Sequence, residues 1–152
     1  MKITLVFTGK TDEPYIREGI EVYAGRLRHY LPFDIVIAGN NNKKKKTGRA
    51  ASAHKEPLRN PGASLLILLD EKGDRFTSQE FARFLETSMI GGHKELAFYT
   101  GGPYGFTEEM YKKADRIISL SDMTFTHQMV RLILVEQIYR AMTIIRGEAY
   151  HH

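Results

Sequence analysis

The pattern of apolar and polar positions along this 152-residue chain predicts strands and helices in alternation. Short runs that are β-branched, alternating or continuously apolar predict strands at residues 3–7, 33–38, 65–69, 96–99 and 117–118. Apolar residues at helical spacing predict helices that start near Pro14, Thr77, Thr107 and Thr126. The segment 47–60 has only a weak helical pattern and is interrupted by Pro57.

The alternation of strands and helices indicates how the sheet is built. Residues 65–69 are continuously apolar and are followed by Asp70 and Gly73, which is typical of a strand buried on both faces of a parallel sheet. We therefore expect one α/β domain over residues 1–152, with a mostly parallel sheet and helices on both faces. In such a sheet, the loops at the carboxyl ends of the strands form the ligand crevice.

The last predicted helix, residues 126–146, has more apolar residues than one buried stripe can hold. Thr126 is the expected N-cap, and Gly147 is the expected C-terminal stop. So many apolar positions need a second covering surface, and the simplest one is another copy of the chain. The sequence therefore predicts a two-fold homodimer.

Composition narrows the function. The chain has no cysteine, which excludes disulfides, thiolate metal sites and a cysteine nucleophile. No apolar run approaches the roughly 20 residues of a membrane-spanning helix, so we expect a cytoplasmic protein with no membrane partner. The net charge is +4, and its excess is concentrated at Lys43–Lys46. We predict a flexible basic loop there, which either attracts a polyanion such as ribosomal RNA or is simply solvated.

A glycine-rich segment, residues 101–105, follows the strand predicted at 96–99. Glycines let the backbone approach a ligand closely, although the same pattern also suits a tight turn between a strand and a helix. The segment is neither GxGxxG nor a Walker loop. Two other strand ends, at Leu69-Asp70 and residues 120–125, could converge with it on one pocket.

Polar residues also interrupt the last helix. Glu136, Arg140 and Thr143 share one face of it, as a helix-stabilising ion pair or as part of a site. For His127, at the helix start, capping or a core hydrogen bond is favoured over catalysis because the helix dipole disfavours its protonated form. The tail, residues 147–152, fits a frayed end, and its two terminal histidines also fit a truncated purification tag.

Several of these segments, taken together, resemble the RlmH family of SPOUT-class RNA methyltransferases. The segments are Leu69-Asp70, residues 100–105, residues 120–127, the helix from Val130-Arg131 to Tyr139-Arg140-Ala141, and Tyr150-His151. The resemblance runs in order along the whole chain and is most specific from Gly101 to His151. It implies a SPOUT-type α/β fold whose C-terminal segment forms a trefoil knot. The knot rests on the resemblance alone, because true knots are rare enough for sequence reasoning to reject them.

The resemblance also implies the ligands and the reaction. S-adenosylmethionine would donate a methyl group, without a metal, to N3 of a pseudouridine in helix 69 of bacterial 23S ribosomal RNA, on assembled ribosomes, with a homodimer completing the substrate site. The implied cofactor contacts are Leu69, Gly101, Leu120, Ser121, Asp122, Met123, Thr124 and Phe125. At Tyr104 the chain departs from the smaller or acidic residue of the family pattern, so we expect a backbone role there.

Three residues would carry the chemistry. His151 would act as the general base or orient the edge of the target base, and Tyr150 would stack on it or hydrogen-bond to it. Arg140 would stabilise the imidate charge or hold a phosphate. Two alternatives remain from the residues themselves: a non-catalytic ribosome-binding module, and a flavodoxin-like nucleotide-binding protein.

Overall fold

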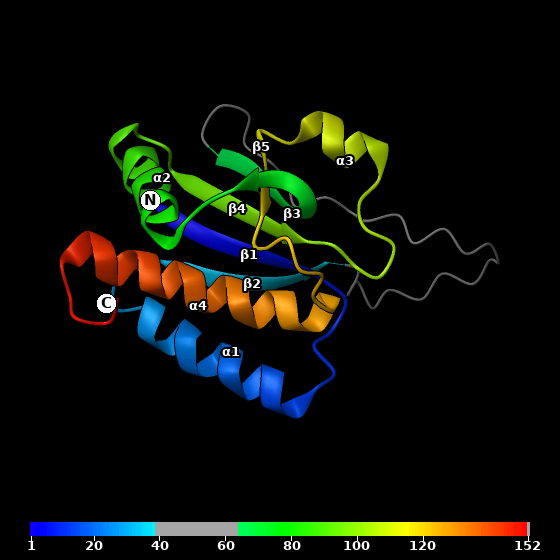
Figure 1. Cartoon of the computed structure of the whole chain (residues 1–152), viewed down its shortest axis with the longest axis horizontal. Helices are drawn as coiled ribbons and strands as arrows, with labels where there is room; N and C mark the ends of the chain where they lie inside the picture. The colour runs from blue at the N-terminus through cyan, green and yellow to red at the C-terminus, as the bar shows by residue number, and fades with distance from the viewer. Residues whose placement is uncertain (39–63, 152) are drawn as a thin grey trace.

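A computed structural model of the chain describes residues 1–38 and 64–151. In this part of the chain, five parallel strands form one sheet in the order β2-β1-β4-β3-β5 (Figure 1). The strands are β1 (Lys2–Thr8), β2 (Phe33–Ala38), β3 (Ser64–Arg75), β4 (Glu95–Thr100) and β5 (Arg116–Ser119). The helices are α1 (Pro14–Leu27), α2 (Ser78–Ile90), α3 (Glu108–Lys113) and α4 (His127–Arg146). The predicted order of strands and helices, and the parallel sheet, are confirmed.

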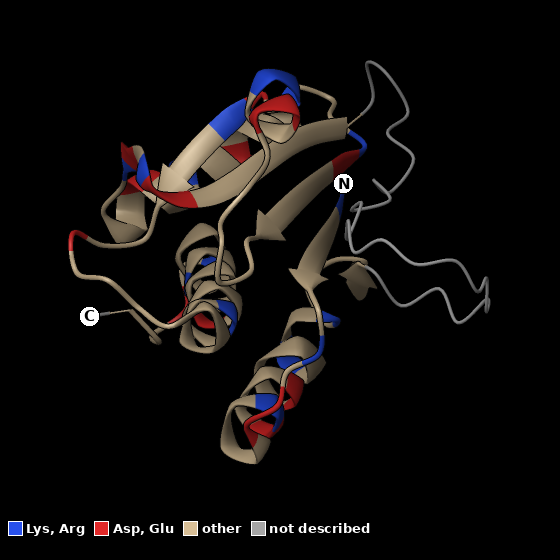
Figure 2. Cartoon of the chain, turned by 90° about the vertical axis from the view of Figure 1, so that its right-hand side faces the viewer, with Lys and Arg blue, Asp and Glu red and all other residues tan. Residues whose placement is uncertain are grey.

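The helices cover both faces of the sheet, as predicted. Figures 1 and 2 show α3 on one face and α1 and α4 on the other, where α2 also packs against α4. Successive side chains of a strand point to opposite faces. Leu5 and its neighbour Phe98 therefore belong to the large core under the long helices, whereas Val6 and its neighbour Tyr99 form a smaller cluster with Met110 of α3.

Helix α4 is covered mainly from within the chain. Thr126 caps it by accepting a hydrogen bond from the Met129 amide at 3.2 Å, and Gly147 ends it with a φ of 68°. Helices α1 and α2 flank α4 on its two sides, and α1 approaches so closely that a Cβ on Gly19 would lie 2.9 Å from Leu132. Helices of the same chain therefore cover much of the apolar surface of α4, whereas residues such as Met129 and Ile133 stay half-buried. The dimer stays a prediction.

Strand β3 is longer than its apolar run. We expected it to end at Asp70 and Gly73, but it continues to Arg75, and its pairing with β5 shifts register between Leu69 and Asp74. At the bulge, Gly73 lies so close to β5 that a Cβ would come within 2.6 Å of its backbone. Hydrophobic periodicity could not reveal this extension, because its residues are polar and the bulge interrupts the two-residue repeat.

The connection between β3 and α2 lies against the segment that leaves β5. Phe76 and Thr77 line a small cavity together with Ser119 and Leu120, and Arg75 pairs with Asp122 at 2.6 Å. For the C-terminal segment to be threaded into a knot, the segment that leaves β5 would have to cross the connection between β3 and α2. The trefoil knot stays a prediction from the resemblance.

Two segments considered in the sequence analysis lie between β2 and β3 in the chain. The basic loop at Lys43–Lys46 and the segment 47–60 lie outside the described residues. In the part of the chain that is described, no helix has the length and apolar character to cross a membrane.

Candidate active site

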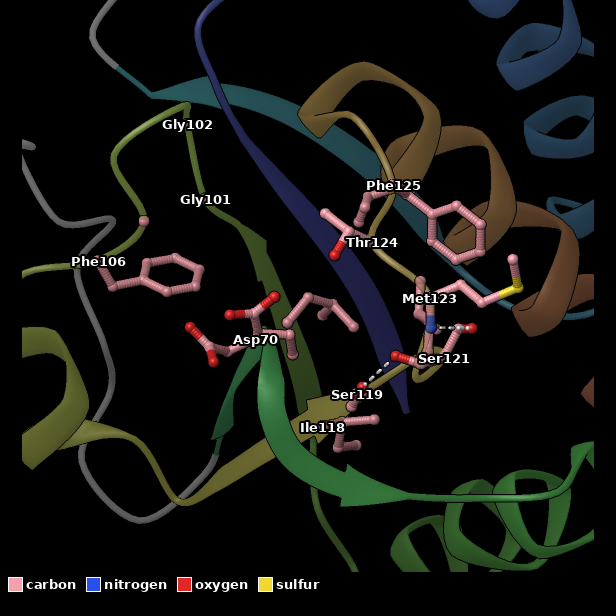
Figure 3. A pocket seen from close by; sticks show the side chains of 15 residues that line it. Asp70, Gly101, Gly102, Phe106, Ile118, Ser119, Ser121, Met123, Thr124 and Phe125 are labelled. Atoms are coloured by element: carbon pink, nitrogen blue, oxygen red, sulfur yellow. Dashed lines mark hydrogen bonds between the residues drawn. The ribbon is translucent and has the colours of Figure 1, made fainter.

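The carboxyl ends of β3, β4 and β5 surround a cavity of about 180 Å³ (Figure 3). It is lined by Leu69, Asp70, Glu71, Gly101, Gly102, Gly105, Phe106, Ile118, Ser119, Leu120, Ser121, Met123, Thr124, Phe125 and Val130. The three segments that the sequence predicted to converge do meet here, although Leu69-Asp70 lies at the bulge inside β3 rather than in a loop after it. Every implied cofactor residue except Asp122 lines this cavity. Asp122 instead pairs with Arg75, away from the lining.

The glycine-rich loop is a tight turn that also forms one wall of the cavity. The Gly105 amide donates to the Gly102 carbonyl at 3.0 Å, and Gly105 has a φ of 71°, which favours glycine. A Cβ on Gly101 would lie 3.3 Å from the Gly105 Cα, and one on Gly102 would lie 3.2 Å from Thr8. Tyr104 is fully exposed, so its side chain takes no part in the wall. The interpretation as a tight turn is confirmed, and the close approach of this backbone to a ligand stays a prediction.

The loop after β5 is shaped by its own short hydrogen bonds. The Ser119 hydroxyl donates to the Ser121 carbonyl at 3.0 Å, and the Ser121 hydroxyl accepts from the Met123 amide at 2.9 Å (Figure 3). These bonds fold the loop so that Leu120 and Phe125 face the cavity while Met123 stays 76% exposed. The opposite wall is thus apolar, with a polar backbone turn beside it.

Carboxylates give the cavity a negative side. Asp70 accepts hydrogen bonds from the Lys72 amide at 2.9 Å and from the Tyr111 hydroxyl at 2.5 Å, and Glu71 lies next to it in the lining. Burial raises the pKa of Tyr111 to about 12, and the hydrogen bond to Asp70 adds to the rise. Tyr111 therefore remains a neutral donor at physiological pH and holds Asp70 in place.

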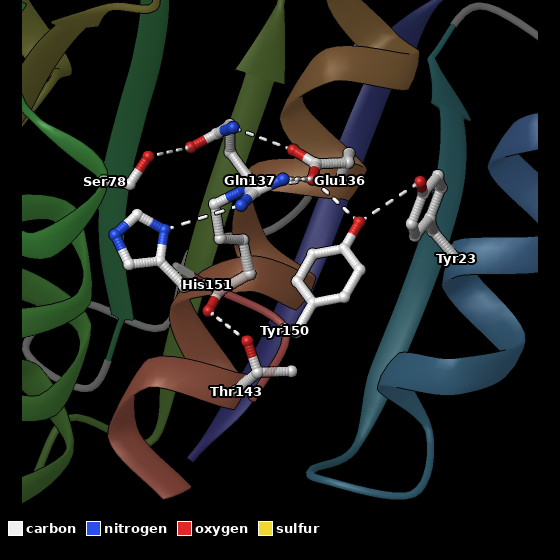
Figure 4. Close-up of polar contacts among 8 residues, drawn as sticks. Tyr23, Ser78, Glu136, Gln137, Thr143, Tyr150 and His151 are labelled. Carbon is white, nitrogen blue, oxygen red and sulfur yellow. Dashed lines mark hydrogen bonds and ion pairs between the residues drawn. The ribbon is translucent and has the colours of Figure 1, made fainter. Parts of the chain in front are cut away.

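The three residues expected to carry the chemistry lie together at another position, around Glu136 of α4 (Figure 4). Arg140 donates to one oxygen of Glu136 from Nη2 at 2.7 Å and from Nε at 3.1 Å, and the Tyr150 hydroxyl donates to the same oxygen at 3.0 Å. The Arg140 guanidinium also stacks 4.7 Å from the centre of the Tyr150 ring. The tail is therefore folded back on α4 and held there.

These contacts fix the protonation of two of the three groups. Burial raises the pKa of the Tyr150 hydroxyl, and hydrogen bonds with Tyr23 and Glu136 raise it further. The hydrogen bond to Glu136 raises the pKa of Arg140. At neutral pH, Tyr150 is therefore a donor and Arg140 a cation.

The His151 ring is oriented by Arg140. Its Nδ1 lies 3.4 Å from Arg140 Nη1, and a guanidinium can only donate, so Nδ1 is the acceptor. In the neutral ring the proton then sits on Nε2. His151 thus presents an N–H donor on its outer side.

Within one chain, the cavity and the tail cluster are separate. Val130 lines the cavity, whereas Arg140 lies ten residues further along the same helix, which at the helical rise is about 15 Å. The structure therefore brings the implied cofactor residues together, and the implied catalytic residues together, but not the two groups with each other.

Sequence reasoning did not single out the polar anchor at the start of α4. Arg131 is fully buried and donates to the Thr8 carbonyl at 2.6 Å and to the Thr11 hydroxyl at 2.9 Å. Gln128 accepts from the Asp12 amide at 3.0 Å, so α4 holds the loop after β1 beside the glycine turn. The signal in the sequence that could have revealed this anchor was the pair Gln128 and Arg131, two polar residues three positions apart in a mostly apolar helix. Thr126, not His127, caps the helix. The His127 Nε2 lies 3.3 Å from Nε2 of the Gln128 side chain, which is a hydrogen-bond contact.

Comparison with known proteins identifies the class to which this fold and cavity belong. A family described as "Predicted SPOUT methyltransferase" matches residues 1–151. A solved structure of a probable methylase family protein from Haemophilus influenzae superposes with a TM-score of 0.54, covering 99% of this chain and 70% of that one. At 11% identity, this likeness shows a shared fold alone.

Curated relatives narrow the class. The chain is 49% identical to a protein of Parabacteroides distasonis named "Ribosomal RNA large subunit methyltransferase H", over 100% of this chain and 99% of that protein. It is also 49% identical to the protein of that name from Geobacter sulfurreducens, over 100% of both chains. The chain belongs to the SPOUT methyltransferase family and, within it, to the RlmH family. This confirms the resemblance and decides against both a non-catalytic module and a flavodoxin-like protein.

Proposed function

We propose that this enzyme transfers a methyl group from S-adenosylmethionine to N3 of a pseudouridine in helix 69 of bacterial 23S ribosomal RNA, acting on assembled ribosomes as a homodimer. The relatives' name, a methyltransferase of large-subunit ribosomal RNA, supports the substrate class. The observation that carries the proposal is the cavity between the bulge of β3 and the segments after β4 and β5, lined by nearly all the residues that the family pattern implies for the methyl donor.

The residues of the cavity fit S-adenosylmethionine. Phe106, Leu120 and Phe125 provide apolar walls for a purine, and the glycine turn leaves backbone groups accessible. Asp70 and Glu71 place negative charge beside a ligand that carries a sulfonium and an ammonium group. When bound, the donor supplies a methyl group on a positively charged sulfur.

The separation of the cavity from the tail cluster supports the homodimer. In a two-fold dimer, the tail of one subunit can reach the cavity of the other, although the two lie about 15 Å apart along α4 of one chain. The half-buried Met129 and Ile133 of α4, and the exposed Met123 at the cavity, leave apolar surface that a second copy would cover.

The protonation states assign roles at the target base. The pseudouridine N3–H bond breaks and its proton passes to solvent. N3 would then bond to the methyl group as the methyl–sulfur bond breaks, and the electron pair of that bond would stay on the sulfur as a neutral thioether. Arg140 stabilises the charge of the deprotonated imide, and the His151 Nε2–H donates to a carbonyl oxygen of the base and so orients it. Tyr150 stacks against the base or donates to it. For His151 to act as the general base through Nδ1, its hydrogen bond from Arg140 would have to break.

The decisive experiment is a methylation assay on ribosomes that lack this modification. We expect one labelled methyl group per ribosome, at N3 of the helix 69 pseudouridine. The His151→Ala variant should transfer at least tenfold more slowly while binding the methyl donor normally, because orientation is lost. His93→Ala, a partly exposed histidine between α2 and β4, is the matched control. Absence of transfer by the wild type would refute the proposal, and near-normal turnover by His151→Ala with an intact dimer would remove that residue from the mechanism.

A further inference from the structure

The C-terminal ends of α1 and α4 meet around a further cavity, of about 340 Å³. It is lined by Arg26, His29, Tyr30, Tyr139, Arg146 and Glu148. We name these six residues the arginine–tyrosine surface. None of them belongs to the cofactor cavity or to the Glu136 cluster.

Two arginines of this surface rest on tyrosine rings. The Arg26 guanidinium lies 5.5 Å from the centre of the Tyr139 ring, and that of Arg146 lies 5.9 Å from the Tyr30 ring. Among the described residues, neither arginine has a hydrogen bond or an ion pair with a carboxylate, and both are exposed. A stacked guanidinium keeps the donors at its edge available, so both can bind an anion from solvent.

The acidic residue of the surface is held by the protein itself. Glu148 accepts a hydrogen bond from the Tyr30 hydroxyl at 2.5 Å, and this bond raises the pKa of Tyr30 to about 12. Two arginines therefore face one carboxylate, and the surface is net positive. The helix dipoles account for a cation at each helix end, but they do not account for the tyrosines beneath both.

The surface continues into the tail cluster. The Tyr139 ring contacts the edge of Tyr30 at 5.9 Å between centres and packs against Tyr150 at 4.8 Å. Arg140 then covers Tyr150. From Arg146 to Arg140 the contacts are continuous: Arg146 lies over Tyr30, the rings of Tyr30, Tyr139 and Tyr150 follow one another, and Arg140 lies over Tyr150.

We propose that the arginine–tyrosine surface binds the RNA strand next to the target base, with Arg26 and Arg146 donating to phosphates. An unpaired base can also stack on the face of each guanidinium group that is turned away from its tyrosine ring. This inference rests on the proposed function. A row of aromatic rings with cations beside it suits unpaired RNA, because phosphates need cations and exposed bases need flat partners.

The test is ribosome binding by the double variant Arg26→Gln/Arg146→Gln, measured over a range of salt concentrations. We expect the Kd to rise about tenfold and the slope of log K against log salt to fall by about one to two, because two phosphate contacts are lost. The kcat at saturating ribosomes and the affinity for S-adenosylmethionine should stay within about twofold of the wild type. The control is Arg17→Gln/Arg83→Gln, which removes the same charge from exposed positions outside the surface.

Each other outcome overturns the inference. An unchanged Kd and slope would show that the surface does not touch RNA, and an equal loss in the control would show a general effect of charge. Weaker binding with an unchanged slope would indicate a ribosomal protein as the partner. A wild type that binds ribosomes but transfers no methyl group would refute the proposed function instead, so the two failures are distinguishable.

Discussion

Glu136 organises the tail cluster through its two carboxylate oxygens. One accepts three hydrogen bonds, two from Arg140 and one from Tyr150, and the other accepts from Gln137 at 2.7 Å. Gln137 in turn accepts from the Ser78 hydroxyl, so α2 also supports the cluster. The Glu136–Arg140 pair that the sequence suggested is therefore more than a helix-stabilising ion pair, because it also fixes the tail.

Replacing Glu136 by Gln should slow methyl transfer about ten- to hundredfold, because a neutral amide holds Arg140 and Tyr150 less firmly. The affinity for S-adenosylmethionine should not change, because the cavity lies elsewhere in the chain. Steady-state kinetics measures both, with Glu86→Gln, an exposed residue of α2, as the control. A double-mutant cycle with Tyr150→Phe should show coupling, and additive losses would mean that Glu136 does not act through Tyr150.

The cavity proposed to hold the methyl donor depends on an irregular strand. The bulge in β3 turns Asp70 and Glu71 into the cavity lining and brings Gly73 against the backbone of β5. Gly73 does not have a positive φ, so its need for glycine comes from close packing rather than from backbone strain. Close packing and the lining of the cavity are thus linked in one strand.

The Gly73→Ala change should lower the free energy of unfolding by about 1–3 kcal/mol, because its Cβ must push β5 away. It should also weaken binding of S-adenosylmethionine. Gly25→Ala, in α1 with open space around the added methyl group, should instead raise stability by about 0.5–1 kcal/mol. Urea unfolding measures both. Equal effects of the two changes would contradict the packing argument.

The cavity and the tail cluster are two places that one chain does not bring together. The cavity lies at the carboxyl edge of the sheet, and the tail cluster lies further along α4. In the proposed dimer, a second copy related by a two-fold axis would join them twice, once at each end. One intact cavity and one intact tail, on different chains, should then suffice for one active site.

This can be tested by combining two inactive chains. Gly101→Val should fill the cavity, and Tyr150→Ala/His151→Ala should remove the tail groups. A purified heterodimer of the two variants should regain about half of the wild-type rate, because one of its two sites is intact. If the heterodimer is as inactive as its parents, each site is built from a single chain.

The sequence by itself determined the elements, their order and the convergence of Leu69, Gly101 and residues 120–125. Apolar periodicity is a local property, and parallel strands bring their carboxyl ends to one edge of the sheet. Only the tertiary structure decided that β3 continues through a bulge, that Asp122 turns to Arg75, that Glu136 holds the tail and that Arg131 anchors the loop after β1. These features depend on which distant backbone or side chain a polar group meets, and a local pattern carries no such information.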